Sequence, residues 1–89
     1  MDRTFIFHSD SGHGWLQVHI ADLAPLGFST QSFTKYSYTC EDYLFLEEDE
    51  DAGRFMRAFV AKHGREPQII NKHKPHNSEI RSYCRLRVS

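Results

Sequence analysis

The sequence predicts an α+β fold in which one main helix packs on a face of an antiparallel sheet, flat or curled, of about five to six strands. Two observations support this class. Short runs rich in β-branched and aromatic residues alternate with turn residues along most of the chain. One further segment carries its apolar residues at helical spacing. The predicted order is two strands, a short helical turn, two strands, the main helix and two final strands.

The first half of the chain predicts two pairs of strands. Thr4–His8 and Trp15–Ile20 are joined by a polar turn with glycines, which accept positive φ angles. Phe33–Cys40 and Tyr43–Glu47 are rich in Thr, Tyr and Phe and form the second pair. Between the pairs, Ala21–Leu26 is predicted to be a short helical turn, because a proline and a glycine limit its length.

The main helix is predicted over residues 50–63. One apolar stripe at helical spacing defines it: Ala52, Phe55, Met56, Phe59, Val60 and His63. The acidic residues before the stripe are expected to cap the helix and to form a solvated first turn that suits the helix dipole. Gly64 is the expected stop. Two more strands are predicted beyond it, Gln68–Lys74 and Glu79–Val88, separated by a turn.

The 89 residues predict a single α+β domain over 1–89. Its core is thin, and an aromatic content of 13% compensates for the short chain. No apolar run approaches the ~20 residues of a membrane span, and no secretory signal is visible. Cys40 and Cys84 are too sparse for a disulfide scaffold, so reduced thiols are expected. These features predict a cytoplasmic protein that makes no membrane contact.

Charge is distributed unevenly along the chain. Residues 1–51 hold ten of the 12 acidic residues, and residues 52–89 hold nine of the 11 basic ones. Either the two halves neutralise each other within one fold, or a charged surface meets a partner. The acidic candidates for such a surface are Glu41, Asp42, Glu47, Glu48, Asp49, Glu50 and Asp51. For residues 48–51 the alternative is the turn and helix start described above.

The basic candidates combine cations with an aromatic residue, on one face of the last predicted strand and on the strand expected beside it: Lys72, Lys74, Arg81, Tyr83, Arg85 and Arg87. Arginines interleaved with an aromatic ring suit phosphate contact and base stacking, so this face predicts nucleic-acid binding as one alternative. The same face would also suit an acidic protein surface.

A polar turn holds the third candidate site, His8, Asp10 and His13. Two imidazoles and a carboxylate that converge could perform acid–base or metal-dependent hydrolysis. The alternative is a hairpin turn in which Asp10 accepts backbone N–H groups. The spacing fits no metal motif, so no metal or cofactor is expected. No nucleophile elbow, P-loop or zinc-protease motif supports an enzyme, and no catalytic residue is assigned.

Four sequence blocks occur in the order Ser9–Val18 (S-D-x-G-H-G-W-L-x-V), Tyr36–Tyr38, Tyr43–Asp49 (Y-x-x-L-E-E-D) and Ile80–Tyr83. In this the chain resembles a group of small uncharacterised proteins encoded by bacteriophages, prophages and plasmids. It departs from their pattern at Ser11, where a proline is expected, and at Glu50, where a cysteine is expected. The resemblance implies a mobile-element gene and a bacterial host cytoplasm, and it carries over no catalytic residue.

Together these observations predict a small non-catalytic protein-interaction module that binds a host or defence component. The leading partner is a protein, met through the acidic region, the basic strand or both. Nucleic-acid binding through the last strand and hydrolysis at the polar turn are the two alternatives. An exposed strand edge would also allow a homodimer by sheet extension.

Overall fold

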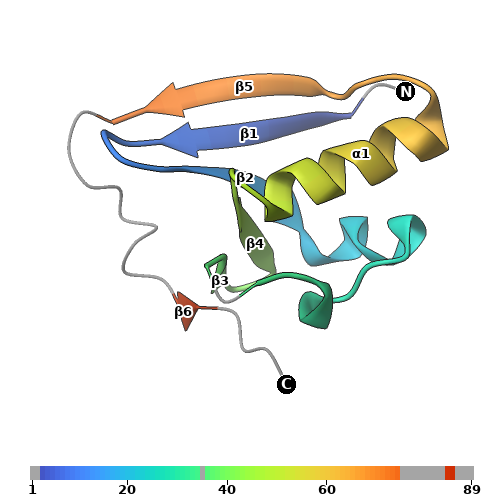
Figure 1. The fold of residues 1–89 in the computed structure, drawn as a ribbon, viewed down its shortest axis with the longest axis horizontal. Coiled ribbons are helices and arrows are strands. Elements are labelled where there is room, and N and C mark those ends of the chain that lie inside the picture. Colours follow the sequence, from blue (N-terminus) through green and yellow to red (C-terminus); the bar gives the residue numbers. More distant parts are fainter. Residues whose placement is uncertain (1–2, 35, 75–83, 86–89) are drawn as a thin grey trace.

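A computed structural model describes residues 3–34, 36–74 and 84–85 of the chain (Figure 1). It shows an α+β fold with one mixed, mostly antiparallel sheet that does not close, one main helix and short 3₁₀ turns, which confirms the predicted class. The elements are β1 (Thr4–Ser9), β2 (Gly14–His19), η1 (Ile20–Asp22), η2 (Ala24–Leu26), η3 (Thr30–Ser32), β3 (Tyr38–Cys40), β4 (Tyr43–Glu47), α1 (Asp51–His63), β5 (Gln68–His73) and β6 (Cys84–Arg85).

The sheet has the strand order β5-β1-β2-β4-β3-β6. Neighbouring strands pair antiparallel except for β1 and β5, which are parallel. The predicted antiparallel sheet is therefore correct for every pair but this one. The reason is α1. It carries the chain back along the sheet after β4, so that β5 runs in the same direction as β4. Since β1 and β4 both run antiparallel to β2, β5 meets β1 in parallel.

The main core lies between α1 and one face of the sheet. Phe55 of α1 is 0% exposed, and its ring lies 5.4 Å from Phe5 of β1 and 6.3 Å from Phe28, measured between centroids. The other buried members come from the strands, the helix and the loop before β3: Leu16, Val18, Leu23, Phe33, Leu44, Leu46, Ala52 and Phe59. The predicted helical stripe is confirmed at its centre, whereas Val60 is 36% exposed and His63 is exposed.

A second, smaller cluster lies on the opposite face of the sheet. It consists of Trp15, Tyr38 and Phe45, with Cys40 packed against them. Trp15 alternates along β2 with Leu16, which belongs to the main core, so the two side chains lie on opposite faces. This face therefore has an aromatic centre without a helix of the described chain over it (Figure 1).

The segment before β3 is not a strand, and the prediction of a strand over Phe33–Cys40 is wrong for its first half. Only Tyr38–Cys40 pairs with β4. The N–H of Ser37 donates to the carbonyl of Thr34 at 3.3 Å, which bends the chain into a turn. The hydroxyls of Thr34 and Ser37 bind the carboxylate of Asp51, so the polar atoms of this segment serve a side-chain network instead of a strand ladder.

The end of the helix agrees with the prediction, whereas its beginning differs from it in part. Gly64 terminates α1 as predicted, with a φ of 73° and an N–H that donates to the Val60 carbonyl at 2.8 Å. At the other end, Glu50 occupies the cap position without a side-chain capping bond. Asp51 follows it and is fully buried, so the expected solvated first turn is wrong for this residue.

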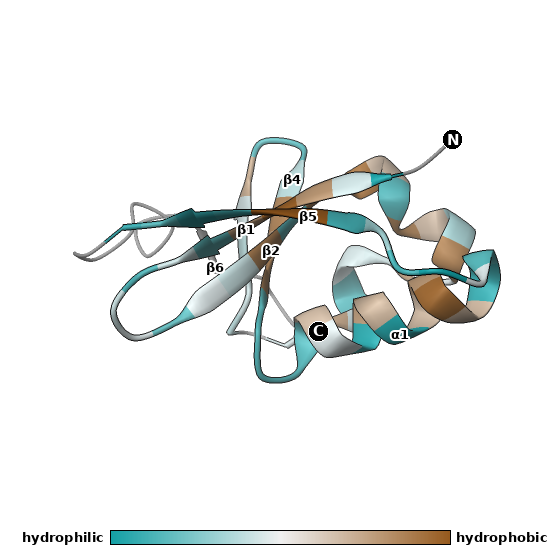
Figure 2. Cartoon of the chain, turned by 90° about the horizontal axis from the view of Figure 1, so that it is seen from above, coloured by the Kyte–Doolittle hydropathy of each residue, from teal (hydrophilic) through white to brown (hydrophobic). Residues whose placement is uncertain are grey.

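The outer strands lie far apart. β5 and β6 form opposite edges of the sheet, at the top and lower left of Figure 1. β5 is hydrophobic in its middle and hydrophilic at both ends (Figure 2). It ends at His73, and the predicted last strand, Glu79–Val88, is described only at Cys84–Arg85, with its other positions outside the described residues. No helix in the described part of the chain is long and apolar enough to cross a membrane.

Truncating Phe55 tests the importance of the α1 contact. We expect Phe55→Ala to lower the free energy of unfolding by about 3–5 kcal/mol, because it removes a fully buried ring from a thin core. Val60→Ala, on the exposed side of the same helix, is the control and is expected to cost less than about 1 kcal/mol. Urea denaturation measures both, and equal losses would contradict this packing.

Candidate binding pocket

A pocket of about 480 Å³ lies on the sheet face that carries the second cluster. This volume is within the range of small-ligand sites. Seven residues line it, from the β1–β2 turn, β2, the segment before β3, β3, the end of β4 and the turn before α1: His13, Trp15, Tyr36, Tyr38, Glu47, Asp49 and Glu50. Below it is called the aromatic–acidic pocket.

Aromatic rings form one part of the aromatic–acidic pocket. Trp15 is 2% exposed, and its ring meets that of Tyr38 edge to face, with centroids 6.1 Å apart. The ring of His13 lies 6.0 Å from Trp15. Tyr36, by contrast, is 55% exposed. The pocket therefore has a buried aromatic floor and one accessible tyrosine at its mouth.

Carboxylates form the other part. Glu47 is the cross-strand partner of Trp15, which places both residues on the same face of the sheet. Asp49 and Glu50 follow in the turn that leads to α1. Among the described residues no base forms an ion pair with any of these three acids. Burial raises the pKa of Glu47 above its ordinary value of 4.5, and the nearby charge of Asp49 adds to this effect.

The buried carboxylate of Asp51 positions both parts. Its Oδ2 accepts hydrogen bonds from the Thr34 N–H at 2.9 Å, the Thr34 hydroxyl at 2.8 Å and the Ser37 hydroxyl at 2.5 Å. The Ser37 oxygen in turn accepts the Glu47 N–H at 2.9 Å. One side chain thus ties the turn that carries Tyr36 to the end of β4 and to the start of α1.

Only some of the acidic residues proposed from the sequence lie at the pocket. Glu47, Asp49 and Glu50 meet at the pocket, as part of the predicted acidic region. Asp51 belongs to the same predicted region but is 0% exposed, so its assignment as a contact residue is wrong. Glu41 and Asp42 are exposed in the turn between β3 and β4, at the far end of β4 from Glu47. Glu48 is exposed but does not line the pocket.

In the predicted polar turn, the side chain of Asp10 stabilises the backbone of the hairpin. Asp10 Oδ1 accepts the N–H groups of Gly12 and His13, each at 2.9 Å, as the hairpin alternative expects. The His8 ring lies 2.7 Å from the Gln17 amide oxygen, measured from Nε2, whereas His13 lies at the pocket. The described residues form no group of three His, Cys, Asp or Glu side chains able to hold a metal ion.

The basic candidates do not lie on adjacent strands. Lys72 and Lys74 are exposed at β5 and just after it, whereas Arg85 belongs to β6 at the opposite edge. The expectation that the lysines continue the face of the last strand is therefore wrong, because β5 pairs with β1 instead. Arg81, Tyr83 and Arg87 are outside the described residues.

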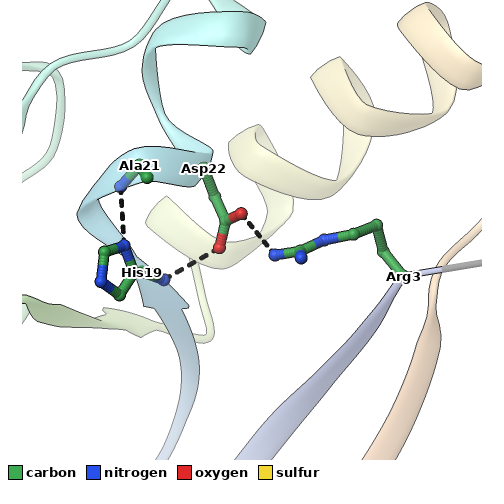
Figure 3. Close-up of polar contacts among 4 residues, drawn as sticks. All are labelled: Arg3, His19, Ala21 and Asp22. Carbon is green, nitrogen blue, oxygen red and sulfur yellow. Dashed lines mark hydrogen bonds and ion pairs between the residues drawn. The ribbon is translucent and has the colours of Figure 1, made fainter.

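The ion pair between Arg3 and Asp22 lies elsewhere in the fold (Figure 3). Asp22 also accepts the His19 N–H at 2.9 Å, and His19 Nδ1 accepts the Ala21 N–H at 3.0 Å. This network caps η1 and joins it to the start of β1. Since both charges belong to the acidic half of the chain, this pair does not neutralise one half with the other.

Sequence reasoning did not foresee the aromatic part of the pocket. Trp15 and Tyr38 are distant in sequence, and only the order β2-β4-β3 brings their strands close. One signal for it was present in the sequence of β2, where Trp15 shares its face of the strand with the polar residues Gln17 and His19. No known protein family, curated protein or solved structure matches the chain. Its function is therefore argued from the geometry of the pocket.

Removing Asp51 tests the network that shapes the pocket. We expect Asp51→Ala to cost about 2–4 kcal/mol of unfolding free energy, because it leaves the buried hydroxyl of Ser37 and the partly buried donors of Thr34 without their acceptor. Glu48→Ala removes an exposed acid three positions earlier and is expected to change stability by less than about 0.5 kcal/mol. Chemical denaturation of both variants decides, and a neutral Asp51→Ala would refute the role of the network.

Neutralising Glu47 tests the electrostatic state of the pocket. Because the pKa of Glu47 is raised in the fold, its ionised form destabilises the protein at neutral pH. This destabilisation disappears as the pH falls from the folded pKa to the unfolded pKa. Glu47→Gln is therefore expected to raise the midpoint of thermal unfolding at pH 7, with the gain over the unmodified protein vanishing near pH 4. A gain that persists at that pH would exclude this origin.

Proposed function

We propose that this chain is a non-catalytic protein-interaction module that binds a basic protein surface at the aromatic–acidic pocket. One observation carries the proposal: rings and carboxylates from separate parts of the chain line a single pocket. The resemblance to mobile-element proteins adds the context, in which the partner is a host or defence component of a bacterial cytoplasm.

The two parts of the pocket would contribute differently to binding. Charged groups at a rim mainly raise the association rate and exclude partners of the wrong charge. Aromatic residues in a desolvated site supply most of the binding energy in many interfaces. The pocket offers both features, because the largely exposed Tyr36 and the carboxylate of Glu50 both line it. Neighbouring exposed acids such as Glu48 extend the negative surface that the partner would meet.

Nucleic-acid binding is the weaker candidate at this pocket, because three carboxylates repel phosphate groups. It would have to use basic residues outside the pocket, and the two of these that belong to described strands, Lys72 of β5 and Arg85 of β6, lie at opposite edges of the sheet. Binding of that kind would fall steeply with salt and would not need the pocket.

A charge-matched comparison tests the proposed function. One variant carries Glu47→Gln, Asp49→Asn and Glu50→Gln. The control carries Glu41→Gln, Asp42→Asn and Glu66→Gln, three exposed acids that do not line the pocket. Each protein is immobilised and used to capture partners from a bacterial lysate, with quantification by mass spectrometry.

We expect a protein partner that the unmodified chain and the control retain equally and that the pocket variant loses at least tenfold. Equal retention by all three proteins would refute binding at the pocket. Short oligonucleotides are titrated in parallel at low and physiological salt. Oligonucleotide binding that is unchanged in the pocket variant would favour the nucleic-acid alternative.

A further inference from the structure

We infer that the aromatic–acidic pocket takes an arginine side chain of the partner protein. This inference rests on the proposed function and names the chemical group that the pocket recognises. It follows from the charge of the lining, from the kind of ring at the mouth and from the number of acceptors around it.

The lining favours a cation. Glu47, Asp49 and Glu50 bring three carboxylates to one pocket, and no base of the described chain forms an ion pair with them. Aromatic ring faces attract cations through their quadrupole, and the pocket is also lined by Trp15, Tyr36 and Tyr38. Acceptors and rings together exclude an anion and disfavour a neutral polar group.

A guanidinium fits this lining better than an ammonium. It is planar, so it can stack on the exposed ring of Tyr36 while its edge carries five N–H donors to the surrounding carboxylates. A lysine ammonium is more strongly hydrated and has no flat face for stacking. The mostly buried floor of Trp15 and Tyr38 would lie against the less polar surface of the group.

Glu47 supports this choice from the side of the protein. Its carboxylate stands on the same sheet face as Trp15 and close to Asp49, where its charge is unfavourable. A bound cation would relieve the repulsion between the two carboxylates. A pocket with crowded negative charge is therefore prepared for a ligand that brings positive charge and several donors.

Peptide titration tests the inference with the full chain. The probes are three acetylated and amidated pentapeptides, Gly-Ser-X-Ser-Gly, in which X is arginine, lysine or citrulline, the neutral isostere of arginine. Trp15 is the one tryptophan of the sequence and lines the pocket, so its fluorescence reports occupancy. Backbone amide shifts in NMR spectra locate the binding at pH 7.5.

We expect the arginine peptide to bind at least tenfold more tightly than the citrulline peptide and at least threefold more tightly than the lysine peptide. The amide shifts should centre on the lining residues. Equal affinity for arginine and lysine would overturn the choice of guanidinium. Equal affinity for arginine and citrulline, or no binding by any peptide, would overturn the inference of a cation site.

Two substitutions of Tyr36 separate stacking from a structural role. Tyr36→Phe keeps the ring and should retain the preference for arginine over lysine. Tyr36→Ala should weaken the arginine peptide at least fivefold and reduce that preference. Tyr43→Ala is the matched control, because Tyr43 is also exposed but lies at the other end of β4. Equal behaviour of Tyr36→Ala and Tyr43→Ala would refute stacking at the mouth.

The two proposals fail in different ways. If no peptide binds while the capture experiment still depends on Glu47, Asp49 and Glu50, the inference of an arginine is wrong and the interaction module stands. If the capture also ignores these residues, the proposed function itself is wrong.

Discussion

The buried carboxylate of Asp51 is the constraint on which the pocket side of this structure depends. Removing a carboxylate from water is costly, and hydrogen-bond donors offset that cost. Here the donors come from Thr34 and Ser37, and Ser37 passes the connection on to the backbone of β4. The first residue of α1 is thereby attached to the segment before β3 and to the strand that leads into the helix.

The pocket inherits its shape from this attachment. Tyr36 lies between Thr34 and Ser37, the two residues that bind Asp51, so these hydrogen bonds hold the turn that positions its ring. Glu47 is held through its own N–H, and Asp49 and Glu50 fill the short connection from β4 to α1. A hydrogen-bond network inside the fold therefore determines which rings and carboxylates meet at the surface.

The acidic residues at this junction have opposite relations to stability. Asp51 is satisfied by hydrogen bonds on one oxygen and contributes to the fold, although its Oδ1 is buried without a partner in the described structure. Glu47 lies in surroundings that raise its pKa and disfavour its charge. Such a cost to stability is consistent with the proposed binding role, because selection acts on an interaction as well as on the fold.

The sequence by itself determined the α+β class, the strand of Tyr43–Glu47, the helix around Phe55 and Phe59 and its end at Gly64. These features depend on the spacing of apolar residues within short segments and on the backbone freedom of glycine, and both are visible in the local sequence. Only the tertiary structure decided that β5 joins β1 in parallel, that Asp51 is buried, and that Trp15 and Tyr38 meet the carboxylates. Each of these depends on which strands become neighbours, a choice made by contacts between segments distant along the chain.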